Sequence, residues 1–147
     1  MLSQVVRSAR CGQQIIQVYS TTLLGRGACY ATAGAADKVI EVQSDNDFAS
    51  KLKEAADSGS LLICDFTAKW CGPCRMIAPI FSQLSKKYEN VSFVKIDIDN
   101  PGVATTVNDH SITGVPTFVY YKGGRRVESF SGARAEFLEE LIKKHTK

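Results

Sequence analysis

The chain has 147 residues, of which 44% are hydrophobic, and this length and composition suit one globular domain with a full core. Its net charge of +3 is unevenly distributed. Residues 1–36 contain three arginines and no Asp or Glu, whereas the rest of the chain carries 15 basic and 15 acidic residues. This balance excludes a strongly basic domain of the kind that binds nucleic acid or a membrane surface by charge.

Residues 1–36 have the composition of a targeting peptide, because they are basic, free of acid and supplied with Ser and Thr. On a helix Leu2, Val5 and Ala9 share one face, an amphipathic pattern typical of mitochondrial import. No apolar run there suits a secretory signal or a membrane span. We therefore predict a mitochondrial transit peptide at 1–36 and a functional domain at 37–147 in the mitochondrial matrix. A disordered tail without targeting function is the alternative.

From residue 39 onward, the apolar pattern alternates between strand and helix. The expected strands are 39–42, 61–66, 91–98, 117–121 and 126–130, and the expected helices are 44–58, 71–88, 103–107 and a last one after Gly132. The continuous apolar run at 61–64 is typical of a strand buried on both faces. Strand-helix-strand order implies a parallel crossover, and the last two strands form a hairpin. The predicted fold is α/β, with a central mixed five-stranded sheet flanked by helices on both faces.

Two cysteines, Cys71 and Cys74, follow the buried strand and open the next helix. We expect the first thiol at the exposed start of the helix, where unpaired backbone N–H groups and the helix dipole favour the thiolate. The second thiol is one turn further on, close enough to form a disulfide with little backbone movement. This arrangement predicts a redox-active pair. Zinc is the alternative, but it needs two further ligands, and no other Cys or His forms a second close pair.

The motif at 70–74 reads WCGPC and resembles that of thioredoxin, rather than the CPYC of glutaredoxins or the CGHC of protein disulfide isomerases. The resemblance extends from about residue 39 to residue 142. Further matching positions are Asp65, Pro79, Lys95, Gly114, Val115, Pro116, Thr117 and Gly132. The resemblance implies a thioredoxin fold and a protein-disulfide reductase, that is, an electron carrier that uses a reversible dithiol–disulfide.

Four residues are expected to carry the chemistry. Cys71 attacks a substrate disulfide to form a mixed disulfide, and Cys74 resolves it. The resemblance implies that Asp65, with a raised pKa, takes the proton from Cys74, and that Lys95 tunes this carboxyl group. The alternatives are a solvated strand end for Asp65 and an ordinary edge-strand lysine for Lys95.

The resemblance also implies an apolar groove for an extended substrate strand, beside a cis proline. The expected groove residues are Trp70, Gly72, Pro73, Gly114, Val115, Pro116 and Gly132. A core position is the alternative for Trp70. We expect Cys64, on the buried strand, to be a small apolar filler, and a regulatory thiol is the alternative.

By resemblance to thioredoxins, the protein binds no cofactor or metal and acts as a monomer. The resemblance also implies that it receives electrons from NADPH through a thioredoxin reductase and passes them to disulfide-bearing proteins such as peroxiredoxins. Nucleic acid and membranes are not expected partners. Two alternatives are a thioredoxin-fold subunit that binds a partner with little redox turnover, and an oxidase or isomerase. The complete motif with Asp65 and Pro116 counts against the first, and Gly72-Pro73 with the missing secretory signal counts against the second.

Overall fold

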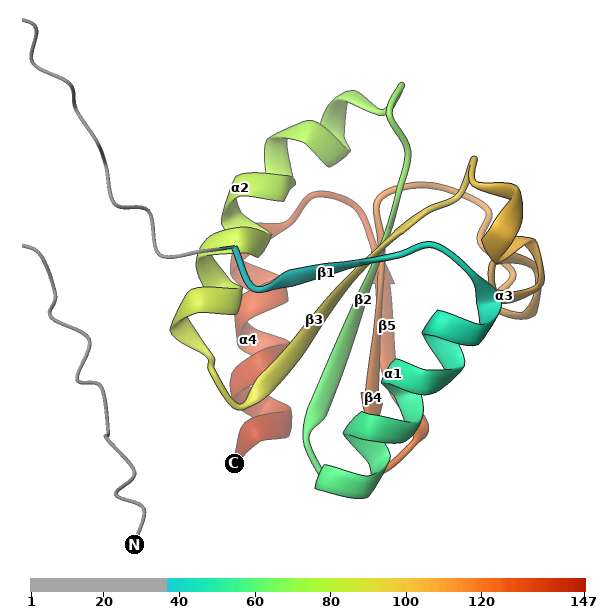
Figure 1. Cartoon of the computed structure of the whole chain (residues 1–147). Coiled ribbons are helices and arrows are strands. Elements are labelled where there is room, and N and C mark those ends of the chain that lie inside the picture. The colour runs from blue at the N-terminus through green and yellow to red at the C-terminus, as the bar shows by residue number, and fades with distance from the viewer. Residues whose placement is uncertain (1–36) are drawn as a thin grey trace, which may run out of the picture. The chain divides into compact units, whose positions relative to one another are not determined.

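The computed structural model describes residues 37–147 (Figure 1), so the predicted transit peptide at 1–36 lies outside the described residues. Within 37–147 the strands are β1 (Val39–Val42), β2 (Leu61–Thr67), β3 (Val91–Asp97), β4 (Thr117–Lys122) and β5 (Arg125–Ser131). The helices of this range are α1 (Asp45–Ser58), α2 (Gly72–Lys87), α3 (Ala104–Asp109) and α4 (Ala135–Thr146), with a 3₁₀ turn, η1, at Pro101–Val103. Each of these helices is too short or too polar to cross a membrane.

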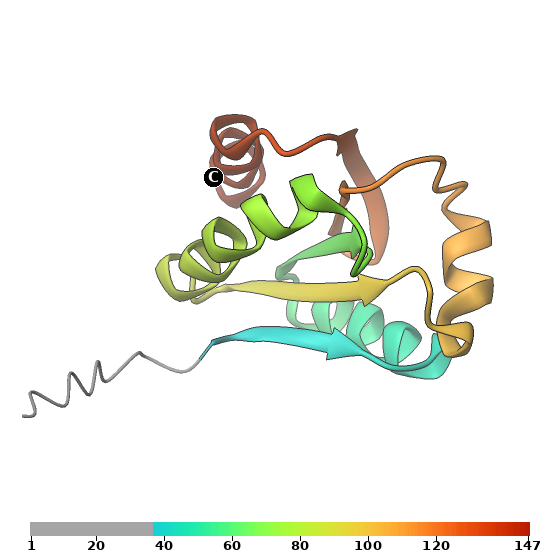
Figure 2. The same cartoon turned by 90° about the horizontal axis from the view of Figure 1, so that it is seen from above.

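The five strands form one mixed sheet in the order β1-β3-β2-β4-β5. β1, β3 and β2 run parallel, whereas β4 is antiparallel to β2 and β5 is antiparallel to β4. Helices α2 and α4 cover one face of the sheet, and α1 packs on the other face together with residues of η1 and α3 (Figure 2). The predicted α/β fold is therefore confirmed, including the parallel β2-α2-β3 unit and the β4-β5 hairpin.

Strand β2 is the central element of the sheet, with β3 on one edge, β4 on the other and all seven of its residues buried. Leu61 and Ile63 pack in the core cluster beneath α2 and α4. Leu62 and Cys64 pack in the opposite cluster, beneath α1. Because successive strand residues point to opposite faces, Asp65 lies on the α2 side of the sheet. The strand then leads directly into the WCGPC motif.

Local sequence signals mark both ends of α1 and the turn of the β4-β5 hairpin. The hydroxyl of Ser44 accepts the backbone N–H of Asp47 at 3.2 Å, so α1 begins where the sequence predicts. The helix ends at Gly59, whose φ of +67° is left-handed. β4 and β5 are joined by Gly123 and Gly124, with φ of +56° and +75°. Two consecutive residues with positive φ suit a tight two-residue hairpin turn of the I′ type.

The short helical segment before β4 differs from the prediction of a single helix at 103–107. The carboxamide oxygen of Asn100 accepts the N–H of Gly102 at 2.9 Å and starts a 3₁₀ turn two residues earlier. Asp45 of α1 then accepts both the backbone N–H and the hydroxyl of Thr106, at 2.7 and 2.6 Å. This contact joins α1 to α3 across 61 positions of sequence, and α3 continues to Asp109.

Candidate active site

The cysteine pair lies at the N-terminus of α2. Cys71 is the N-cap residue, and the helix begins at Gly72 with Pro73 in its first turn. The backbone N–H of Cys74 points at Sγ of Cys71, with an N···S distance of 3.2 Å. The two cysteines are joined by a disulfide, and their Cα atoms are 5.3 Å apart. In the reduced protein, this N–H and the helix dipole favour negative charge on the Cys71 sulfur.

Cys71 is buried, which corrects the expectation that it lies exposed at the start of the helix. It is 4% exposed, and Cys74 is 2% exposed. Both pack with Ala68, while Ile98 and Val115 lie against them. These two covering residues come from later parts of the chain, so the local sequence around the helix start does not reveal them. In the disulfide form, exposure therefore does not distinguish the two sulfurs, whereas the N–H directed at Cys71 does.

The loop before β4 lies against the first cysteine. Its Val115–Pro116 peptide bond is cis, as the resemblance implies. The carbonyl oxygen of Val115 is 3.6 Å from Sγ of Cys71. On the other side of the loop, the N–H of Gly132 donates to the carbonyl of Pro116 at 2.8 Å. The carbonyl of Gly114 accepts a hydroxyl hydrogen bond at 2.7 Å from the first residue of β4. The fold thus joins the cis-proline loop and Gly132 to the cysteine pair.

Trp70 is 67% exposed, so the alternative of a core tryptophan is wrong. Met76, in the first turns of α2, is also 67% exposed, and Pro73 is exposed between them. At Gly72 a Cβ atom would meet nothing within 4 Å. Exposed apolar side chains are informative when they adjoin a reactive group. Here the exposed side chains flank the Cys71–Cys74 disulfide, and another chain can closely approach the backbone at Gly72, between the two cysteines.

Asp65 is buried within β2, at 2% exposure, and its Oδ1 atom has no hydrogen-bond partner among the described residues. The solvated strand end considered for this residue is therefore wrong. Burial raises the pKa of Asp65 to about 7, and the positive charge of Lys95 partly opposes that rise. A carboxyl group with a pKa near neutrality can both accept and return a proton at physiological pH.

Lys95 is the residue paired with Asp65 in the parallel β2-β3 register. Since β3 lies between β1 and β2, the alternative of an edge-strand lysine is wrong. Lys95 lines a hollow of about 260 Å³ that also contains Cys74. The remaining lining residues are Thr67, Ala68, Lys69, Arg75, Ala78 and Asp97. We call this the Cys74 hollow; it brings together the second cysteine and the ends of β2 and β3.

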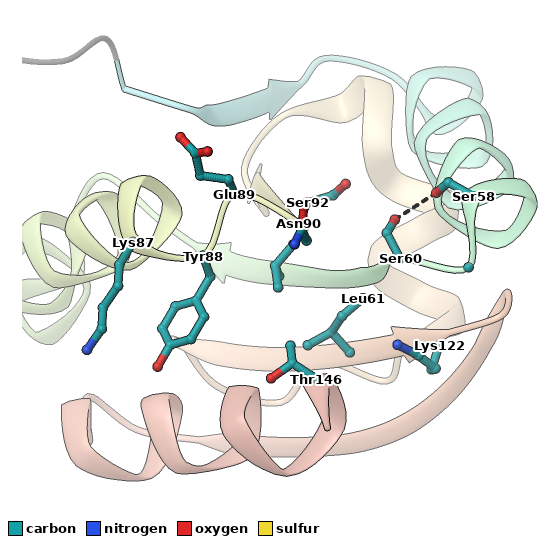
Figure 3. A pocket seen from close by; sticks show the side chains of 12 residues that line it. Ser58, Ser60, Leu61, Lys87, Tyr88, Glu89, Asn90, Ser92, Lys122 and Thr146 are labelled. Carbon is teal, nitrogen blue, oxygen red and sulfur yellow. Dashed lines mark hydrogen bonds between the residues drawn. The ribbon is translucent and has the colours of Figure 1, made fainter.

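A larger hollow, of about 780 Å³, lies at the opposite end of the sheet (Figure 3). It adjoins Leu61 and Val91, the first residues of β2 and β3, whereas the cysteine pair follows the last residue of β2. Its wall includes Ser58 and Ser60, whose hydroxyls are hydrogen-bonded at 2.9 Å. No cysteine lines it. The smaller hollow, not the larger one, belongs to the redox site.

Cys64 is a free, fully buried cysteine. Burial, reinforced by the neighbouring Asp65, raises the pKa of its thiol far above the ordinary value. Because the thiolate is the reactive form, this side chain fits the role of an apolar filler. Within residues 37–147, no group of three or more His, Cys, Asp or Glu side chains is placed to hold a metal ion.

A dithiol that closes into a disulfide at a helix N-terminus can exchange two electrons with another disulfide. Together, the fold and the site define a small thiol-disulfide oxidoreductase. The family model described as thioredoxin matches residues 38–144. The chain belongs to the thioredoxin family.

Three relatives illustrate the similarity. A thioredoxin H-type of Brassica campestris is 42% identical over 111 residues, which are 76% of this chain and 89% of that protein. The mitochondrial thioredoxin O1 of Arabidopsis thaliana is 37% identical over 123 residues, 84% of this chain and 63% of that protein. The crystal structure of a thioredoxin from Nicotiana alata is 36% identical and superposes with a TM-score of 0.70, covering 74% of this chain and 93% of that one.

Sequence reasoning missed most of the lining of the Cys74 hollow, including Arg75 and Asp97. Arg75 directly follows the motif, and Asp97 ends β3 two residues after Lys95. The available signal was the alternation of β3, which places Lys95 and Asp97 on the same face of the strand. That this face meets the first turn of α2 becomes visible only in the fold.

Asp65→Asn tests the buried carboxyl. The folded pKa of Asp65, about 7, lies above its ordinary value of 3.8, so its contribution to stability is fully present below the lower value and is lost as the pH rises toward 7. The neutral Asn does not titrate. Relative to wild type, the variant should therefore gain about 2–3 kcal/mol in the free energy of unfolding between pH 5 and pH 8.

Urea unfolding of both proteins at a series of pH values measures this difference. Asp57→Asn, on the exposed surface of α1, is the control for the loss of one carboxylate elsewhere. A difference between Asp65→Asn and wild type that does not change over this pH range would contradict the raised pKa.

Proposed function

We propose that this protein is a mitochondrial protein-disulfide reductase of the thioredoxin type. NADPH supplies its electrons through a thioredoxin reductase, and disulfide-bearing proteins such as peroxiredoxins receive them. The observation that carries the reductase function is the Cys71–Cys74 disulfide at the N-terminus of α2, with the N–H of Cys74 3.2 Å from the Cys71 sulfur. That arrangement favours thiolate on one defined sulfur of the pair.

In the first step, the Cys71 thiolate attacks one sulfur of the partner's disulfide. A new S–S bond forms between Cys71 and the partner, the partner's own S–S bond breaks, and its second sulfur leaves as a thiolate. The N–H of Cys74 and the positive end of α2 stabilise the attacking charge. The reaction needs no bound cofactor, because both electrons come from the dithiol.

In the second step, Cys74 loses its proton and attacks the Cys71 sulfur, which releases the partner as a dithiol. Asp65 is the base that takes this proton, directly or through a water molecule. Its pKa of about 7 suits this role. Lys95, its partner in the β2-β3 register, limits the rise of that pKa. The protein is left with the Cys71–Cys74 disulfide, which the reductase reduces again.

The partner chain binds in an extended form beside the disulfide. The backbone of Val115 lies next to the Cys71 sulfur, and an extended partner chain can pair with the backbone of this loop by β-addition. The accessible residues of the surface that receives it are Trp70, Gly72, Pro73, Gly114, Val115 and Gly132, whereas Pro116, the remaining predicted groove residue, is buried. The two large exposed groups, Trp70 and Pro73, precede and follow Cys71 in the motif and supply apolar contact there.

A mitochondrial location is supported by the acid-free, basic composition of residues 1–36. The alignment with the relative named thioredoxin O1, mitochondrial, covers 84% of this chain. That share exceeds the part formed by residues 37–147, so the alignment includes some of the N-terminal segment. Since the H-type relative is the more similar in identity, the evidence for a mitochondrial location comes mainly from the N-terminal segment.

Replacement of each cysteine tests the order of the two steps. Cys71→Ser should abolish reduction of insulin disulfides by dithiothreitol above the rate of the reagent alone. Cys74→Ser should form a stable mixed disulfide with substrate through Cys71, because the resolving thiol is missing. Non-reducing electrophoresis with mass spectrometry identifies the trapped adduct.

Trapping through Cys74 in the Cys71→Ser protein would reverse the roles of the cysteines. A wild-type protein with no rate above dithiothreitol would instead favour the alternative of a partner-binding subunit.

Asp65→Asn should slow the second step while it leaves the first unchanged, because only the resolving thiol must lose its proton to a base. Loss of a positioned general base costs about 10²–10⁴-fold in rate. Stopped-flow measurement of tryptophan fluorescence in single turnovers can separate formation from resolution of the mixed disulfide. A variant that resolves the adduct as fast as wild type would remove Asp65 from the mechanism.

The N-terminal sequence of the protein isolated from mitochondria tests the location and the domain boundary together. We expect the mature chain to begin near residue 37 and to lack Cys11 and Cys29. Recovery of the protein only outside mitochondria, with Met1 or Leu2 at its N-terminus, would refute the transit peptide.

A further inference from the structure

The strongest unassigned feature of the domain is the Cys74 hollow. We propose that it is a subsite for an acidic side chain of the partner protein, which enters it while the partner's disulfide reacts at the neighbouring sulfurs. This inference rests on the proposed reductase function and specifies which partner disulfides the protein prefers.

The charges around the hollow do not balance. Lys69, Arg75 and Lys95 line it, and Asp97 is the one carboxylate among its lining residues. The buried Asp65 beside Lys95 adds at most a partial negative charge at neutral pH, because its pKa is about 7. The Lys69–Asp97 ion pair is long, at 3.8 Å, and its lysine side chain is 89% exposed at the rim. Among the described residues, neither Arg75 nor Lys95 makes an ion pair within 4 Å. Positive charge in a recess without a matching anion favours an anionic ligand.

The size of the hollow selects a side chain rather than a free metabolite. Its volume of about 260 Å³ is below the roughly 300–1,000 Å³ of sites that enclose drug-sized ligands. Ala68 and Ala78 form part of its wall, and their methyl groups leave room for the short aliphatic stem of Asp or Glu. The carboxylate at the end of such a stem can reach Arg75, whose planar guanidinium group binds carboxylates in a bidentate manner.

The position of the hollow suits a residue close to the attacked cysteine. Cys74 lines it, yet Val115, Pro116 and Gly132 do not. The hollow is therefore a contact separate from the cis-proline loop, although both adjoin the same disulfide. A partner chain covalently attached to Cys71 holds its neighbouring side chains beside this hollow at high effective concentration.

Because a second hollow of opposite charge lies beside the first, the preference for an acidic side chain depends on where that side chain lies in the partner. It is about 310 Å³ in volume, it shares Lys69 and Asp97 with the Cys74 hollow, and Glu41 and Asp99 also line it. An acidic side chain displaced toward this second hollow meets three carboxylates and one lysine. Discrimination then comes from repulsion at the wrong position as well as attraction at the right one.

The test uses disulfide-bonded peptides that differ only by Glu or Gln at one position, moved from three residues before the attacked cysteine to three residues after it. At low salt, one or two positions should show kcat/KM about three- to ten-fold higher for Glu than for Gln. The ratio should approach one at high salt, because the charges are partly exposed.

Two double variants with the same change in net charge show where the preference arises. Lys69→Gln with Arg75→Gln should bring the ratio of kcat/KM for the Glu and Gln peptides to about one. Lys122→Gln with Arg125→Gln, on the exposed β4-β5 hairpin, should retain it. Because each variant is compared with itself on two peptides, any general effect on cysteine reactivity cancels. Equal loss of the ratio in both variants, or no Glu preference at any position, would overturn the proposal.

Binding without reaction separates this inference from the proposed function. Amide chemical shifts of the oxidised protein are titrated with the preferred peptide in its Glu and Gln forms, with Ser in place of both cysteines. We expect Ala68, Cys74 and Ala78 to shift with the Glu form alone. Inorganic phosphate that produces the same shifts at the same concentration would reassign the hollow to free anions and overturn the side-chain subsite.

The two failures are therefore distinguishable. Peptides that bind through Glu but are not reduced would contradict the reductase function and leave the subsite supported. Peptides that are reduced equally well with Glu or Gln would contradict the subsite alone.

Discussion

The enclosure of β2 is the constraint on which the rest of the domain depends. The strand has hydrogen-bonded neighbours on both edges and a helical layer on both faces, so any charged group in it loses its hydration. Asp65 is the one residue of β2 with an ionisable carboxyl group, and it lies two residues before the end of the strand. A buried carboxylate without a complete set of partners costs several kcal/mol. Groups with such strongly shifted pKa values gather at functional sites.

The pattern of strands and helices could be predicted because most of it is local. The apolar run at 61–64 identified a strand buried on both faces, and the short spacing of the strands at 117–121 and 126–130 identified a hairpin, since each signal depends on residues close in sequence. Boundaries moved where a distant group intervenes. The helical segment before β4 became a 3₁₀ turn followed by α3, and the contact from Asp45 to Thr106 that joins α3 to α1 is made by α1, far away in sequence.

The candidate site was likewise predictable where it depends on local sequence features. The cysteine spacing and the odd carboxylate in an apolar strand are sequence features, and both led to residues that the fold brings to one end of the sheet. The burial of Cys71 was not predictable, because Ile98 and Val115 cover the pair from segments that reach it only after folding. Arg75 and Asp97 were missed for the same reason. Their shared hollow exists only because the first turn of α2 lies over the end of β3.

The inaccessible position of Cys64 sets the electron capacity of the domain. Among residues 37–147, three cysteines are present, but one of them is enclosed on all sides and held as a neutral thiol. The folded domain can therefore store one pair of electrons, and its oxidation stops at a single internal disulfide. It offers no third sulfur for a crosslink to a second molecule, so repeated cycles return the domain to the same two states.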